Sequence, residues 1–124
     1  MCGFAGCINK SHLSKNELMN LASDMSAVLG HRGPDSSGIW IEDNNNVAFS
    51  HARLSIQDLS EAGHQPMRST SGNYVIAFNG EIYNHLEIRK LLDSSVSIEI
   101  DWVGHSDTET ILCAVDILGI EKTL

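Results

Sequence analysis

The first residues of the chain, MCGFAG, place a cysteine directly behind the initiator methionine and a glycine behind that cysteine. Removal of Met1 would leave Cys2 carrying both a thiol and a free α-amine. An α-amine has an ordinary pKa of about 7.7 to 8.0, so it can act as general base for the thiol of its own residue. Cys2 therefore has two interpretations, a self-sufficient nucleophile or a small buried hydrophobe, which is a common role of free cysteine.

Three further places in the sequence could serve such a nucleophile. Asn79-Gly80 follows an apolar run and could offer a side-chain amide and a backbone N–H to an oxyanion, although Asn-Gly is also the commonest short hairpin turn. Arg53 ends a predicted strand and could bind a carboxylate through two parallel hydrogen bonds, or could be an ordinary surface cation. Asp107 lies in the first turn of a predicted helix, where the helix dipole favours a carboxylate in any case.

Composition excludes several classes of protein. The chain has 124 residues, 42% of them hydrophobic, and no tract near the roughly 20 apolar residues of a membrane span. Its first residues do not resemble a signal peptide, which predicts a cytoplasmic location. A net charge of -8 with scattered Lys and Arg argues against nucleic acid and for a small-molecule or protein partner. The six histidines lack metal-binding spacings, so no metal site is expected, and Cys7 and Cys113 are assigned to the core.

Periodicity and capping signals predict alternating strands and helices. Strands are expected over residues 3–8, 39–42, 47–54, 74–81 and 98–102, with loops over 31–38 and 55–71. Capping boxes open two helices, Ser14 with Glu17 and Ser106 with Glu109, and Gly30 and Gly119 end them. Asn84 is expected to cap a third helix. The last residues, IEKTL, are typical of a helix in its first turn, which predicts that the chain is part of something longer.

Six motifs occur together along the chain: MCGFAG, HRGPDSSG, HARLSIQDL, QPM, FNGEIYNH and HSDTETIL. In order and style they resemble the N-terminal glutaminase domains of asparagine synthetases, which are class II glutamine amidotransferases with the N-terminal nucleophile hydrolase fold. The combination of HRGPD with RLSI and NGEIYN is similar to asparagine synthetases rather than to the sugar-phosphate or purine amidotransferases. The resemblance covers essentially the whole chain.

The resemblance implies a role for each candidate residue. Cys2 would attack the side-chain amide of glutamine, and Asn79 with the Gly80 N–H would hold the oxyanion. Glutamine would be bound by the remaining five residues: Arg53 on its α-carboxylate, Glu81 and Asp107 on its α-ammonium, and backbone groups of Leu54 and Ile56 around the pocket. The loop over residues 32–35 is expected beside the nucleophile without a defined chemical role.

The resemblance also implies a fold and a larger protein. The expected class is α+β, with antiparallel sheets sandwiched between helix layers and the domain over residues 1–124 incomplete at its C-terminus. No cofactor is expected here; ATP and Mg²⁺ would act in a missing synthetase domain, on the same longer chain or on a separate one, that uses the ammonia to make asparagine. Exposed sheet edges would favour self-association, including a homodimer. Two alternatives remain: a non-catalytic binding or remnant module, and an amidotransferase domain serving another acceptor such as a polysaccharide precursor.

Overall fold

A computed structural model of the chain describes residues 2–56, 58–97 and 99–124. These residues form two compact units. The first contains the chain as far as Ser55 together with His64–Pro66 and Ala77–Asn79, and the second contains Ile56–Gly63, Met67–Ile76 and Gly80–Leu124.

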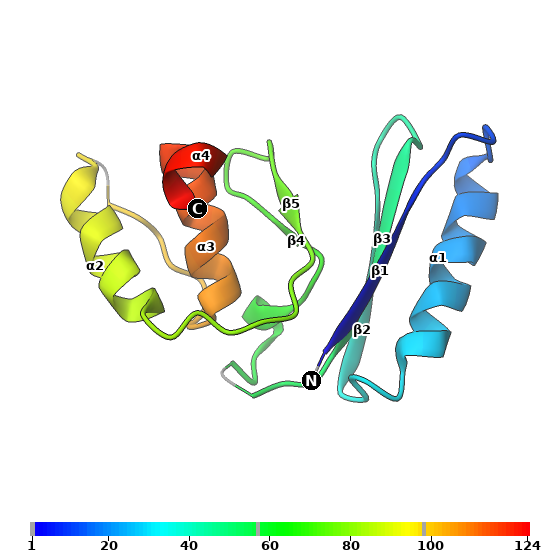
Figure 1. The fold of residues 1–124 in the computed structure, drawn as a ribbon, viewed down its shortest axis with the longest axis horizontal. Helices are drawn as coiled ribbons and strands as arrows, with labels where there is room; N and C mark the ends of the chain where they lie inside the picture. The colour runs from blue at the N-terminus through cyan, green and yellow to red at the C-terminus, as the bar shows by residue number, and fades with distance from the viewer. Residues whose placement is uncertain (1, 57, 98) are drawn as a thin grey trace. The chain divides into compact units, whose positions relative to one another are not determined.

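The first unit is a three-stranded antiparallel sheet with one helix on it. The strands lie in the order β1 (Gly3–Ile8), β3 (Val47–Arg53) and β2 (Ser36–Ile41). Because side chains alternate along a strand, β3 presents two different faces. Ala48 on one face is fully buried under helix α1 (Lys15–Leu29), which lies along the sheet (Figure 1). The other face carries His51 and Arg53.

Helix α1 confirms the strongest local prediction. Ser14 and Glu17 form both hydrogen bonds of the capping box, with Ser14 N–H donating to Glu17 Oε2 over 2.9 Å and Glu17 N–H to Ser14 Oγ over 3.4 Å. Leu18 is buried against the sheet, as the apolar stripe predicts. The stripe is narrower than predicted, however, because Val28 at its edge is 74% exposed.

Strand β2 corrects a predicted boundary. The loop over 31–38 ends earlier than predicted, because Ser36 already pairs with Arg53 and Gly38 with His51. Serine and glycine favour turns, but here they continue an antiparallel ladder set by the neighbouring strand. The pairing brings the start of β2 to the end of β3.

The second unit combines a small hairpin with helices. The hairpin pairs β4 (Met67–Arg68) with β5 (Val75–Ile76) and follows a single 3₁₀ turn, η1 (Glu61–Gly63), so the predicted loop over 55–71 is partly regular. The helices are α2 (His85–Ser95), α3 (Asp107–Leu118) and α4 (Ile120–Thr123), and α2 packs beside α3 (Figure 1). Gly119 ends α3 with φ 83°, a conformation that favours glycine.

Two strand predictions were wrong. Of the run over 74–81, only Val75–Ile76 is a strand, and its residues are half-buried, not buried, because β4 is its one partner among the described residues. Ile100 and Trp102 lie outside any strand, and Ile98 lies outside the described residues. Asn84 precedes α2 but makes no side-chain cap, since its backbone has φ −97° and ψ 21° rather than an extended conformation.

A network around Arg89 of α2 replaces the strand predicted near Trp102. Its guanidinium donates to Thr110 Oγ1 (2.8 Å) and Glu109 Oε2 (2.9 Å), and lies 4.1 Å from the centre of the Trp102 ring. It also donates to the carbonyls of Gly104 (2.9 Å) and Ser106 (3.0 Å). Arg89 therefore ties α2 to α3 and to the segment that precedes α3.

Glu109 explains why the second capping box is half formed. Ser106 Oγ accepts from Glu109 N–H over 3.2 Å, as predicted. The Glu109 carboxylate accepts instead from the backbone N–H groups of Val103 (2.7 Å) and Gly104 (3.0 Å), besides binding Arg89.

The predicted α+β class with antiparallel sheets is confirmed. Within the described residues, no helix combines the length and the apolar character needed to cross a membrane.

Candidate active site

The eight predicted site residues divide between the two units. The first unit holds Cys2, Arg53, Leu54 and Asn79, and the second holds Ile56, Gly80, Glu81 and Asp107. Arg53 and Asp107 are buried, whereas the segment from Asn79 to Glu81 is exposed and Ile56 is 72% exposed.

The thiol of Cys2 lies at the end of β3. The Leu54 N–H donates to Cys2 Sγ over 3.3 Å, and the thiol is 3.5 Å from the Leu54 carbonyl oxygen, to which it can donate. Both polar groups of one residue thus fix the sulfur position. Leu54 directly follows Arg53, the last residue of β3, so the predicted nucleophile, which precedes β1, is bound at the end of the strand that carries the predicted carboxylate-binding residue.

The HRGPD loop supports this strand end. A Cβ on Gly33 would lie 2.3 Å from the Ala52 carbonyl oxygen and 2.5 Å from the Arg53 carbonyl carbon, so only glycine allows the two backbones to approach so closely. Asp35 N–H donates to the Arg53 carbonyl over 3.0 Å, and Asp35 Oδ2 accepts from Ser55 N–H over 2.7 Å. The loop, to which the sequence assigned no role, therefore fixes the backbone on both sides of Leu54.

A buried histidine on β3 is a feature that the sequence did not single out. His51 is fully buried on the Arg53 face, and its Nε2 lies 3.2 Å from the carbonyl oxygen of Phe78. A carbonyl only accepts, so Nε2 carries the proton. Its Nδ1 is buried and has no hydrogen-bond partner among the described residues. The sequence contained one sign of its importance, because the alternation of side chains along a strand places His51 on the same face as Arg53.

The environment of His51 predicts a dependence of stability on pH. Burial lowers its pKa from the ordinary 6.5, the Phe78 hydrogen bond opposes this, and the charges of His64 and Arg53 lower it further. The folded chain therefore keeps this imidazole neutral at a pH where the unfolded chain already takes up a proton. Its contribution to stability is complete above about pH 6.5 and falls as the pH drops below that value, levelling off below the folded pKa.

Urea unfolding at a series of pH values checks this prediction. We expect the free energy of unfolding of the wild-type chain to fall more between pH 7.5 and pH 5.5 than that of His51→Gln, which cannot titrate. Equal losses in the two proteins would contradict a neutral buried His51.

In the second unit, Asp107 contacts the segment that contains the other predicted acidic residue. Its Oδ2 accepts from the Ile82 N–H over 2.8 Å, and Ile82 follows Glu81. The carboxylate is buried at the N-terminus of α3, where Ser106 caps the helix. Asp107 thus holds Glu81's neighbour in place, a contact that links two of the residues predicted to bind an α-ammonium.

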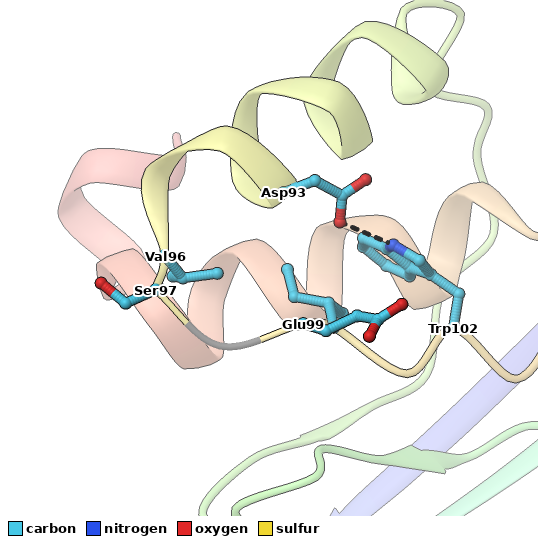
Figure 2. Close-up of a pocket in the computed structure, with 6 residues that line it drawn as sticks. Asp93, Val96, Ser97, Glu99 and Trp102 are labelled. Atoms are coloured by element: carbon cyan, nitrogen blue, oxygen red, sulfur yellow. Dashed lines mark hydrogen bonds between the residues drawn. The ribbon is translucent and has the colours of Figure 1, made fainter.

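One pocket of the second unit lies apart from the predicted residues. Figure 2 shows it between the end of α2 and the segment that follows, with Asp93 accepting a hydrogen bond from the indole N–H of Trp102 over 3.0 Å. None of the eight predicted site residues lines it.

In the part of the chain that the structure describes, no group of three or more His, Cys, Asp or Glu side chains could hold a metal ion.

Comparison with known proteins places these features in a family. A family model described as the glutamine amidotransferase domain matches residues 1–124. The chain belongs to this family. The resemblance carried by the six motifs is therefore confirmed.

Three relatives show the range of proteins that contain such a glutamine amidotransferase domain. Asparagine synthetase 1 of Bacillus subtilis is 40% identical over 90% of this chain and 17% of its own length. Asparagine synthetase B of Escherichia coli is 48% identical over 59% of the chain and 13% of its own length. A Gibberella zeae protein named amidase chry2 is 30% identical over 97% of the chain and 18% of its own length. The chain thus spans less than a fifth of each of these relatives.

Proposed function

We propose that this glutamine amidotransferase domain hydrolyses the side-chain amide of glutamine to glutamate and ammonia, with Cys2 as nucleophile. One observation carries the proposal: the Cys2 thiol is held by both backbone groups of Leu54, directly after Arg53, at the end of a buried central strand. Family membership supplies the reaction, and this geometry supplies a fixed thiol at the end of the strand that carries a buried arginine.

The chemistry proceeds through a thioester. After removal of Met1, the Cys2 amine takes the thiol proton as sulfur attacks the amide carbon of glutamine. The Asn79 side chain and the Gly80 N–H donate to the resulting oxyanion. Collapse of the intermediate breaks the carbon–nitrogen bond, and the proton held by the amine leaves with ammonia. Water then attacks the thioester, releasing glutamate and restoring the thiol.

Charged groups would select an amino acid by both of its ends. Arg53 binds the α-carboxylate of glutamine, and Glu81 and Asp107 receive the α-ammonium. Leu54 and Ile56 contribute backbone groups to the pocket. The contact between Asp107 and the Ile82 N–H supports this assignment, because it fixes the backbone next to Glu81.

The destination of the ammonia is proposed from the relatives. Two are named asparagine synthetases, which supports delivery to an ATP- and Mg²⁺-dependent synthetase part that forms asparagine in the cytoplasm. That part could lie on the same chain or on a separate one, and the domain could act as a homodimer. The relative named an amidase favours a second candidate, a domain of the same chemistry that serves another acceptor.

Covalent labelling tests the proposal. We expect 6-diazo-5-oxo-L-norleucine, a glutamine-like electrophile, to form one adduct per chain, at Cys2. In the labelled protein Met1 should have been removed, so that Cys2 is the N-terminal residue. L-glutamine should protect the thiol, and D-glutamine is the matched control that should not. Retention of Met1, or labelling spread equally over Cys2, Cys7 and Cys113, would contradict the proposal.

A further inference from the structure

We propose that His51 and Gln65 are positioning residues that bind the backbone C=O and N–H of Phe78 and thereby place the side chain of Asn79. The inference rests on the proposed function, in which Asn79 donates to the oxyanion. Neither His51 nor Gln65 has a role in the chemistry described above.

Both polar groups of Phe78 are bound by side chains. The Phe78 N–H donates to Gln65 Oε1 over 2.6 Å, and the Nε2–H of His51 donates to the Phe78 carbonyl over 3.2 Å. Gln65 and His51 are themselves buried. The two hydrogen bonds fix the peptide group on each side of Phe78, which restricts rotation of the backbone at this residue, and Asn79 is the next residue along the chain.

The local backbone explains why side chains are needed. Residues 77–79 lie outside every described strand, so no ladder pairs their N–H and C=O groups. Phe78 is half-buried, and an unpaired buried peptide group costs about 1–3 kcal/mol. His51 and Gln65 supply the two hydrogen bonds that strand pairing would otherwise provide.

The two side chains are held by the sheet. His51 lies on β3, the central strand, opposite Gly38 of β2. A Cβ on Gly38 would lie 2.1 Å from the Gln65 carbonyl oxygen and 2.5 Å from His64 Nε2, so Gln65 can lie against the sheet only because residue 38 is glycine. A rigid strand therefore supports the contacts to Phe78.

The arrangement makes β3 a shared support for three functions. His51 binds the Phe78 carbonyl, and Arg53 is the predicted carboxylate-binding residue. Leu54, which directly follows the strand, fixes the Cys2 sulfur. Donors to an oxyanion act only when they are fixed in advance, and misplacement by about 1 Å can cost about 100-fold in rate. Loosening Phe78 should therefore lower kcat more than it weakens glutamine binding.

Matched variants at both positions test the inference on the full chain. His51→Gln and Gln65→Glu keep a donor and an acceptor near the original positions, whereas His51→Met and Gln65→Met keep bulk and remove the hydrogen bond. His31→Met, at an exposed histidine, is the control for a general effect of the replacement. We measure glutamine hydrolysis, the alkylation rate of Cys2 by iodoacetamide, and hydrogen exchange of the Phe78 amide.

We expect the two Met variants to lose about 10- to 100-fold in kcat with little change in KM or in Cys2 alkylation. The conservative variants His51→Gln and Gln65→Glu should keep most of the wild-type kcat. The Phe78 amide should exchange faster in Gln65→Met than in wild type. Unchanged kcat in the Met variants, or an equal loss in the conservative ones, would overturn the inference.

The exchange measurement separates this inference from the proposed function. If the wild-type chain forms no glutamate from glutamine, the proposed function fails, and with it the role of Asn79. Slow Phe78 exchange that depends on Gln65 would then leave the hold on this peptide as a structural feature alone. If the wild type is active and its Phe78 amide exchanges freely, the function stands and the positioning role is refuted.

Discussion

Replacing Cys2 by alanine is expected to lower the rate of glutamine hydrolysis at least about 1000-fold, because the proposed thioester forms on the Cys2 sulfur. The free energy of unfolding should change little. The Cys2 side chain is half-buried and makes its polar contacts only with Leu54 among the described residues. Ammonia release under saturating glutamine and urea unfolding of both proteins measure the two quantities.

Cys113→Ala is the matched control. Cys113 is a free cysteine of α3, and burial, with the charges of Asp116 and Glu109, raises the pKa of its thiol. A thiol that stays protonated at neutral pH is a poor nucleophile, so this variant should keep wild-type turnover. Hydrolysis that persists in Cys2→Ala, or that disappears in Cys113→Ala, would contradict the assignment of the nucleophile.

Replacing Arg89 by methionine is expected to destabilise the folded chain by about 3 kcal/mol or more. Methionine retains much of the apolar stem but leaves the Glu109 carboxylate without its cation. Removing one partner of a fully buried pair typically costs about 3–5 kcal/mol, and the Arg89 and Glu109 side chains are 11% and 15% exposed, so we expect the lower end of that range. The four hydrogen bonds of the guanidinium and its contact with Trp102 are lost together. Chemical denaturation followed by circular dichroism measures the change.

Lys90→Met provides the comparison for Arg89→Met. Lys90 is the next residue of α2, and it is exposed, so its replacement should change the free energy of unfolding by no more than about 0.5 kcal/mol. An Arg89→Met variant as stable as Lys90→Met would show that the network contributes nothing to the free energy of unfolding.

Reduced glutamine affinity is also expected in Arg89→Met, because Arg89 binds the carbonyl of Ser106, the neighbour of Asp107.

Local signals predicted the helices well because their causes are local. The capping box of Ser14 and Glu17 involves residues three apart, and the stripe containing Leu18 depends on helical spacing alone. Gly119 ended α3 for a similarly local reason, its positive φ. Such features form in nearly the same way whatever the rest of the chain does.

Strands were predicted less well because a strand needs a partner. The predicted strand over 74–81 begins with the apolar run YVIAF, which favours a strand, yet pairing with β4 extends over two residues, and Phe78 is bound by side chains instead. Trp102 fits an alternating pattern, but its indole binds Asp93 and its ring faces Arg89. These partners lie too far along the chain for a local sequence pattern to reveal them.

The same reason separates the site residues that the sequence could suggest from those it could not. Cys2, Arg53 and Asn79 stand out because their own chemistry suits an amide substrate. His51 and Gln65 act through a backbone 27 and 13 residues away. Gly33 needs the approach of Ala52, which only the folded chain shows. Residues that support others are visible only in contacts.

Strand β3 also sets where this domain can change in length. Its two faces differ completely, with Ala48 under α1 and His51 and Arg53 on the opposite side. Inserting or deleting one residue within β3 would exchange these faces and place an arginine against the apolar helix. The turn over residues 43–46 carries no such restriction, since its side chains are not part of this alternation. Insertions and loop grafts should therefore be accepted at this turn and rejected within the seven residues that follow it.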